Sequence, residues 1–236
     1  HLAKALQLCD PTGSWHTARD GLAELVCCLG LIAGTLSKIA QDIALLAQTE
    51  VGEVKEPAIA GRGVSSTMPH KQNPVLSQQI IVAARAVRGL VPVMLEAMTQ
   101  DHERGTGVWP SEWALIPDAC SHALAALDLM EELMAGLRVD EVRMAANIKL
   151  SQDFVYAEAV MMSLAHHVGR QRAHDLVEIA VRRSDAEPFN RALLSIPEIE
   201  EFLSEEELDS IFSGDLHRAA GRAATKQVLG ARRQAD

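Results

Sequence analysis

The apolar residues in the first part of the chain recur at steps of three and four. Between Thr17 and Glu50 they form a stripe that begins at Leu22 and continues to Leu46. This spacing predicts one long amphipathic helix with Thr17 as its N-cap. At about 1.5 Å per residue the helix would be roughly 50 Å long. That length suits an elongated bundle shared between subunits better than a compact globule.

Two further long helices are predicted before residue 139. One follows Pro74, which suits a first helical turn with Asn73 as its cap, and it runs to about Gln100. The other spans roughly residues 110–137. Between the first two helices, Gly and Pro residues break the pattern over residues 51–73. An irregular segment of this length is usually functional.

The elements become shorter past residue 139. We therefore expect an all-α chain in two parts, with a long-helix bundle over residues 1–139 and a small helical domain over residues 140–236. The capping-box spacing of Ser204 and Glu207 marks the start of one of the later helices. These helices are expected over residues 140–148, 155–167, 170–184, 204–212 and 216–229.

Composition agrees with a helical, globular protein. The 236 residues are 48% hydrophobic but only 3% aromatic, and Ala and Leu favour helices packed on helices. A net charge of -10 argues against non-specific nucleic-acid binding, and no run of ~18 uninterrupted apolar residues predicts a membrane span. Four cysteines without a C-x-x-C pattern suggest reduced thiols in a cytoplasmic protein. Because the chain begins at His1 in a helical pattern, we expect a fragment that lacks its N-terminal portion.

The segment from Gly61 to Pro74 concentrates the chemically useful side chains. It combines hydroxyls, an imidazole, the amine of Lys71 and the carboxamide of Asn73, and it ends at a predicted helix N-terminus, where anions are favoured. The residues alone indicate an anion-binding loop with a candidate Ser/Lys pair. They also allow a plain Ser-rich loop in which Asn73 is only a cap.

Residues 65–74, which read SSTMPHKQNP, resemble the S-S-x-M-P-x-K-x-N-P signature of the fumarase/aspartase superfamily. The preceding segment 48–54 is also similar to that superfamily. Residues 15–20, 102–104, 109 and 112–113 resemble one branch, the 3-carboxy-cis,cis-muconate cycloisomerases. The resemblance covers nearly the whole chain and corresponds to the C-terminal half of a protomer about twice its size.

The resemblance implies roles for the signature residues. Ser65 matches the catalytic base of the superfamily, and Lys71 and Asn73 match positions that hold substrate carboxylates. Ser66, Thr67 and Met68 of the same signature are then expected at the substrate. In the cycloisomerase direction either Lys71 or Ser65 delivers the proton, and the sequence does not choose between them.

Four residues outside the signature are further candidates for binding substrate carboxylates. They are His16 and Arg19 at the start of the first long helix, and His102 and Arg104 on the irregular segment after the second. For His16 and Arg19 the alternative is helix capping with a salt bridge from Arg19 to Asp20. No metal-ligand spacing or Gly-rich nucleotide fingerprint is present, so we expect neither metal nor cofactor.

The resemblance predicts conversion of 3-carboxy-cis,cis-muconate to 4-carboxymuconolactone by a homotetramer. The alternatives are a fumarate-releasing lyase of the adenylosuccinate or argininosuccinate type, and a non-catalytic scaffold with the same fold. Two departures bear on this choice. Val64 stands where the superfamily usually has Gly, and Gln78 stands where fumarases and adenylosuccinate lyases usually have a Glu. Because superfamily active sites draw loops from three subunits, we expect this chain alone to be inactive.

Overall fold

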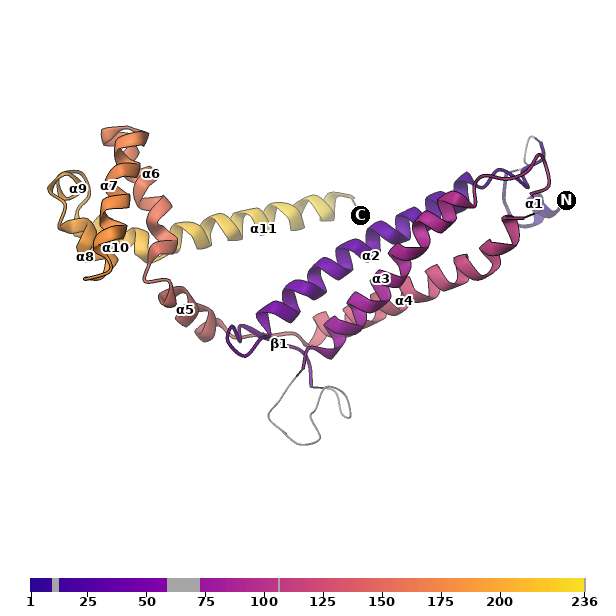
Figure 1. The fold of residues 1–236 in the computed structure, drawn as a ribbon, viewed down its shortest axis with the longest axis horizontal. Coiled ribbons are helices and arrows are strands. Elements are labelled where there is room, and N and C mark those ends of the chain that lie inside the picture. Colours follow the sequence, from indigo (N-terminus) through magenta and orange to yellow (C-terminus); the bar gives the residue numbers. More distant parts are fainter. Residues whose placement is uncertain (10–12, 59–72, 106, 236) are drawn as a thin grey trace. The chain divides into compact units, whose positions relative to one another are not determined.

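The computed structural model describes residues 1–9, 13–58, 73–105 and 107–235 (Figure 1). It divides into two compact units, His1–Arg143 and Met144–Asp236. The sequence places this division near residue 139. The first unit extends past that point because a strand at residues 138–139 and the side chain of Arg143 both bind its backbone.

The first unit is a bundle of three long helices that pack on one another. In Figure 1 the helix α3 runs antiparallel to α2 and α4. A short antiparallel pair, β1 with β2, joins Val54 to Val139 and Lys55 to Arg138 at one end of the bundle. The elements are α1 (Leu2–Ala5), α2 (Asp20–Leu46), β1 (Val54–Lys55), α3 (Val75–Glu96), a 3-10 turn (Trp109–Ser111), α4 (Glu112–Gly136) and β2 (Arg138–Val139).

The core of the bundle is built in layers along the helices. Large aliphatic side chains pack at the end where α3 begins, including Leu76, Ile80 and Leu133. The middle layer is mostly alanine, and a further layer with Val26 and Met94 fills the end where α2 and α4 begin. The small residues of the middle layer let the helices approach closely.

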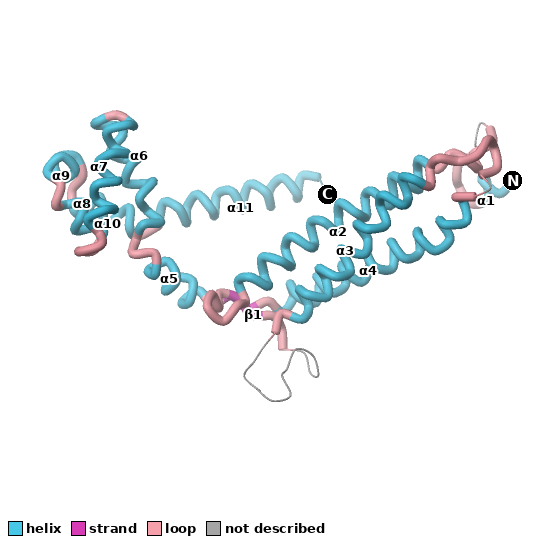
Figure 2. The backbone as a smooth tube through the Cα atoms, viewed as in Figure 1, coloured by secondary structure: helices cyan, strands magenta, loops and turns pink. Residues whose placement is uncertain are grey.

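In the second unit the short helices between residues 157 and 212 lie together (Figure 2). They share an apolar core of their own, and a 21-residue helix follows them. Two of them, α8 and α9, are absent from the sequence prediction because six residues are too few to show helical periodicity. The predicted capping box of Ser204 and Glu207 is present at the start of α10. The helices are α5 (Glu141–Leu150), which crosses the division, α6 (Ala157–Val168), α7 (Arg170–Arg183), α8 (Phe189–Leu194), α9 (Pro197–Phe202), α10 (Glu205–Phe212) and α11 (Asp215–Ala235).

The predicted caps of the two leading long helices are wrong. The helix α2 begins at Asp20 with Arg19, not Thr17, at the N-cap position. The cap position of α3 is held by Pro74, not Asn73, and no side chain of that cap residue bonds to the helix. At α3 a tertiary partner, the carboxylate described below, binds first-turn amides in place of a local cap. At α2 the amides of Leu22 and Ala23 bind the carbonyl oxygen of Arg19.

Apolar side chains are also abundant on the outside of the long helices. By length and composition α2 and α3 would be able to cross a membrane. Both pack against each other and against α4, as core helices of a bundle do. Exposed apolar residues remain on all three helices, among them Leu31 on α2, Val82 on α3 and Leu124 on α4. These surfaces suit burial against further helices.

Candidate active site at the ends of the bundle

The signature segment lies in part outside the described residues. The predicted catalytic residues Ser65 and Lys71 fall within residues 59–72, as do Ser66, Thr67 and Met68. Their roles therefore stay predictions. The structure does describe both flanks of this segment, up to residue 58 on one side and from the exposed Asn73 on the other.

The flank before the segment is anchored to the bundle. The strand β1 pairs with β2, and Pro57 packs so closely on Gly136 that a Cβ at Gly136 would lie 2.5 Å from the Pro57 ring. Arg143 adds two hydrogen bonds, from Nε to the carbonyl oxygen of Val51 at 2.9 Å and from Nη2 to that of Glu50 at 2.7 Å. The backbone that leads into the signature is thereby fixed.

The flank after the segment is held by Glu56. The backbone amides of Leu76 and Ser77, in the first turn of α3, each donate to one carboxylate oxygen of Glu56 at 2.9 Å. The buried hydroxyl of Ser77 donates to the same carboxylate at 2.6 Å. The sequence predicts that this helix N-terminus favours an anion, and the anion bound there is the chain's own carboxylate, that of Glu56.

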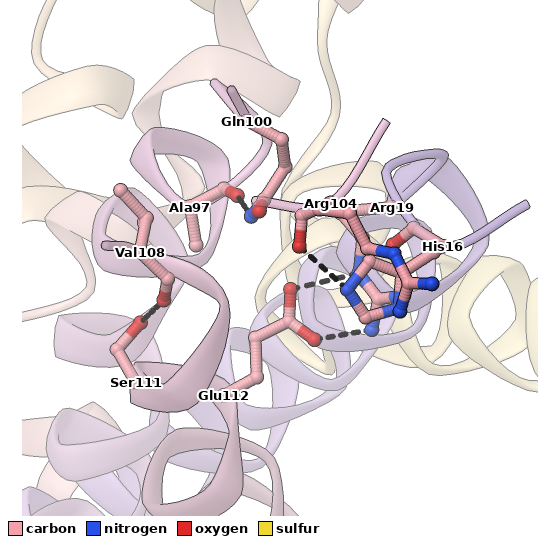
Figure 3. A network of polar contacts seen from close by, with 8 residues as sticks. All are labelled: His16, Arg19, Ala97, Gln100, Arg104, Val108, Ser111 and Glu112. Carbon is pink, nitrogen blue, oxygen red and sulfur yellow. Dashed lines mark hydrogen bonds and ion pairs between the residues drawn. The ribbon is translucent and has the colours of Figure 1, made fainter. Parts of the chain in front are cut away.

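His16 lies at the opposite end of the bundle and contacts the segment that follows α3. Its Nε2 is 2.7 Å from the carbonyl oxygen of Arg104 (Figure 3). Its ring lies 5.1 Å from that of Trp109, measured between centroids. Trp113 meets Trp109 edge-on at 4.8 Å. The predicted neighbours His16 and Arg104 are thus brought together, and aromatic rings line the same place.

Arg19 forms a buried ion pair with Glu112, not with Asp20 (Figure 3). Its Nε donates to Oε1 of Glu112 at 2.9 Å, Nη2 donates to Oε2, and Nη1 donates to the carbonyl oxygen of His16 at 3.0 Å. The guanidinium therefore binds α4 and the residues before α2. This geometry favours a positioning role over direct contact with a substrate carboxylate.

A tight turn presents His102 and Arg104. The amide of Gly105 donates to the carbonyl oxygen of Asp101 at 3.0 Å, and both His102 and Gly105 have positive φ. A Cβ at Gly105 would lie 1.8 Å from the side-chain oxygen of Gln100, so a larger residue would have to displace that side chain and also adopt a positive φ, which favours glycine. The side chains of His102 and Arg104 are exposed, where a ligand or another copy of the chain can reach them.

The two groups of candidate residues lie at opposite ends of α3. Asn73 precedes the first residue of this helix, whereas His102 and Arg104 follow its last. The 22 residues of α3 correspond to about 33 Å of helix. One bundle therefore does not bring Asn73 and the His102 turn to a single small molecule.

The sequence did not predict three residues that hold the flanks of the signature segment, namely Glu56, Ser77 and Arg143. Each acts through a partner distant in the chain, which no local pattern reveals. Among the residues that the structure describes, no three His, Cys, Asp or Glu side chains are grouped to hold a metal ion.

Comparison with known proteins identifies the family of the chain. A model described as "Lyase" matches residues 2–89, and one described as "Adenylosuccinate lyase C-terminus" matches residues 153–228. The chain is 47% identical over 210 residues to 3-carboxy-cis,cis-muconate cycloisomerase of Pseudomonas putida, covering 88% of this chain and 50% of that protein. The chain belongs to the fumarase/aspartase superfamily. The resemblance seen in the signature is thereby confirmed.

Further similar proteins show how much of a longer relative this chain covers. The crystal structure of 3-carboxy-cis,cis-muconate lactonizing enzyme from Pseudomonas putida matches with a TM-score of 0.79 and 43% identity, over 89% of this chain and 47% of that one. Trans-aconitate decarboxylase 1 of Mycosarcoma maydis is 43% identical, over 89% of this chain and 43% of that protein. The chain spans about half the length of the curated relatives it matches.

Proposed function

We propose that the protein of which this chain forms part converts 3-carboxy-cis,cis-muconate to 4-carboxymuconolactone. The observation that carries the proposal is the signature of residues 65–74 in a chain 47% identical to a cycloisomerase. The aromatic cluster of Trp109 and Trp113 supports it, because such a lining suits a small diene acid better than a nucleotide phosphate.

The reaction is an intramolecular addition that needs no oxidant or metal. One substrate carboxylate oxygen bonds to an alkene carbon, and the π electrons move to the adjacent carbon as an aci-carboxylate. A proton then forms the new C–H bond. We assign proton delivery to Ser65 or Lys71, and we assign the holding of carboxylates and of the developing charge to Lys71, Asn73 and the exposed pair His102 and Arg104.

Ser66, Thr67 and Met68 are proposed to contact substrate from the same segment. His16 is proposed to act at the other end of the bundle, through its contact with Arg104. For Arg19 the ion pair with Glu112 supports an indirect role, in which it orients the residues before α2.

We further propose that the active site is completed by other copies of the chain in a homotetramer. The separation of Asn73 from His102 by the length of α3 supports this, since a second bundle packed antiparallel brings opposite ends together. Exposed apolar residues on the long helices offer the surface for such packing. The net charge of -10 argues against nucleic acid as a partner, and four cysteines without a C-x-x-C pattern support a cytoplasmic protein. Its proposed partners are its own copies and a small polycarboxylate.

A second candidate function is decarboxylation of an unsaturated tricarboxylate. The 43% identity to trans-aconitate decarboxylase 1 favours it, since both substrates are unsaturated acids with several carboxylates. The fumarate-releasing alternative has less support, because Gln78 cannot carry the charge of the usual Glu. Retention of Ser65, Lys71 and Asn73 argues against a non-catalytic scaffold.

The test is an assay of the purified full-length protein on 3-carboxymuconate, with loss of the diene absorbance as the signal. The variants Ser65→Ala and Lys71→Ala are each expected to lower kcat by about 100-fold or more, as removal of an acid–base group does. Turnover within a few-fold of wild type in both variants would show that the roles are misassigned. Release of carbon dioxide from trans-aconitate, without lactone formation, would select the second candidate.

A further inference from the structure

We propose that Glu56 is a positioning residue of the active site, which fixes the start of α3 against the strand that leads into the signature segment. The inference rests on the proposed function, because that function makes the segment between Glu56 and α3 catalytic. Nothing in the family signature itself includes Glu56, which precedes it by nine positions.

The carboxylate of Glu56 sits on a fixed platform. It directly follows β1, whose partner β2 leads into the Arg143 anchor, and the next residue, Pro57, packs on the last residue of α4. The bundle therefore fixes the backbone on both sides of Glu56, and with it the position from which the side chain contacts α3. Glu56 itself is partly buried, so its hydrogen bonds are shielded from competition with water.

The first turn of α3 supplies the donors that bind Glu56. Ser77 has no exposed surface, and its amide and hydroxyl both donate to Glu56, while the amide of Leu76 donates to the second oxygen. The remaining first-turn amides, of Val75 and Gln78, bind the carbonyl oxygens of Asn73 and Pro74. Glu56 thus sets the position of the turn that directly follows Asn73.

These contacts require a carboxylate and not merely a polar group. Three donors converge on two acceptor oxygens at the positive end of a helix, where a negative charge is favoured. In Glu56→Gln an NH₂ group replaces one acceptor and faces a donor. One consequence for the reaction is that the first-turn amides of α3 are already occupied and do not bind a substrate carboxylate.

The experiment compares four variants of the full-length protein. Glu56→Ala removes the carboxylate, Glu56→Gln keeps one acceptor, and Ser77→Ala removes one donor while leaving the two amides. Glu96→Gln is the matched control, because Glu96 is an exposed glutamate at the other end of the same helix. The measurements are kcat and KM on 3-carboxymuconate, hydrogen exchange of the peptide 74–80, and the rate with added formate.

The expected order of kcat is wild type, then Ser77→Ala and Glu56→Gln, then Glu56→Ala at about a tenth of wild type or less, with KM changed by less than about threefold. Formate, a small carboxylate that fits the vacated space, should restore part of the rate of Glu56→Ala but not of Ser65→Ala. Exchange of peptide 74–80 should rise in both Glu56 variants and stay unchanged in Glu96→Gln.

Two results would overturn the proposal, namely unchanged exchange in Glu56→Ala, or raised exchange with a wild-type kcat. If Glu56→Ala does not fold, the milder variants Glu56→Gln and Ser77→Ala test the proposal, and the same two results in them would overturn it. Absence of muconate turnover in the wild type together with raised exchange in the variants would reject the proposed function but support the holding of α3 by Glu56.

Discussion

At the residue scale, the ion pair of Arg19 and Glu112 is a deeply buried charge contact in the bundle. The two side chains are only 7% and 4% exposed. Taking both charges out of water is costly, and the cost is met by their mutual hydrogen bonds and by the bond from Arg19 to the carbonyl oxygen of His16. The pair therefore joins the start of α2 to the start of α4.

Breaking this pair from one side should destabilise the protein strongly. We expect Glu112→Leu to lower the free energy of unfolding by about 3–5 kcal/mol, because Arg19 is left as an unpaired buried charge. The double variant Arg19→Met with Glu112→Leu should recover much of that loss. Denaturant unfolding of both proteins measures the difference, and equal stability of the single and double variants would contradict the expectation.

At the element scale the long helices depend on close approach in their middle. A Cβ at Gly30 of α2 would lie 2.6 Å from Cγ2 of Val91 on α3, whereas no atom lies within 4 Å of one at Gly34. Of these two glycines, four residues apart in the same helix, only Gly30 is therefore required by packing. Gly30 lets α3 approach, and Gly34 only lowers helix propensity.

The two glycines should respond oppositely to the same substitution. Gly30→Ala is expected to destabilise by about 1–3 kcal/mol through overpacking against Val91. Gly34→Ala should stabilise by about 0.5–1 kcal/mol through helix propensity. Thermal unfolding of both variants tests this. A stabilised Gly30→Ala would show that α3 can move away from α2 at little cost in free energy.

The capping box of α10 makes a pH-dependent contribution to the second unit. Hydrogen bonds from the backbone and hydroxyl of Ser204 hold the pKa of the Glu207 carboxyl below its usual value of 4.5. The contribution is therefore complete above about pH 4.5 and is lost as the pH falls through the lowered pKa. Amide protection at the start of α10 should fall in acid for wild type, and Glu207→Gln should remove that pH dependence.

At the scale of the whole molecule the two ends of α3 carry different parts of the proposed site. Asn73 lies at one end and the turn with His102 at the other. If each site combines ends from different copies, two inactive variants can complement each other. This is a property of the assembly and of no single residue.

We expect Ser65→Ala and His102→Ala to be poorly active alone and to recover activity when mixed. After joint dissociation and reassembly, random assortment should leave about a quarter of the sites free of both substitutions. Activity of the mixed sample is the measurement, and reassembly of each variant by itself is the control. No recovery, despite proven subunit exchange, would place both residues in one chain's site.

The sequence by itself determined the helical class, the long helices and the superfamily, because periodic apolar steps and a contiguous signature are local properties. Only the tertiary structure decided that Glu56 holds the start of α3, that Arg19 pairs with Glu112 and not with Asp20, and that His16 meets Arg104. These contacts join residues 20 to 93 positions apart. Their partners are fixed by how the helices pack, which no short stretch of sequence encodes.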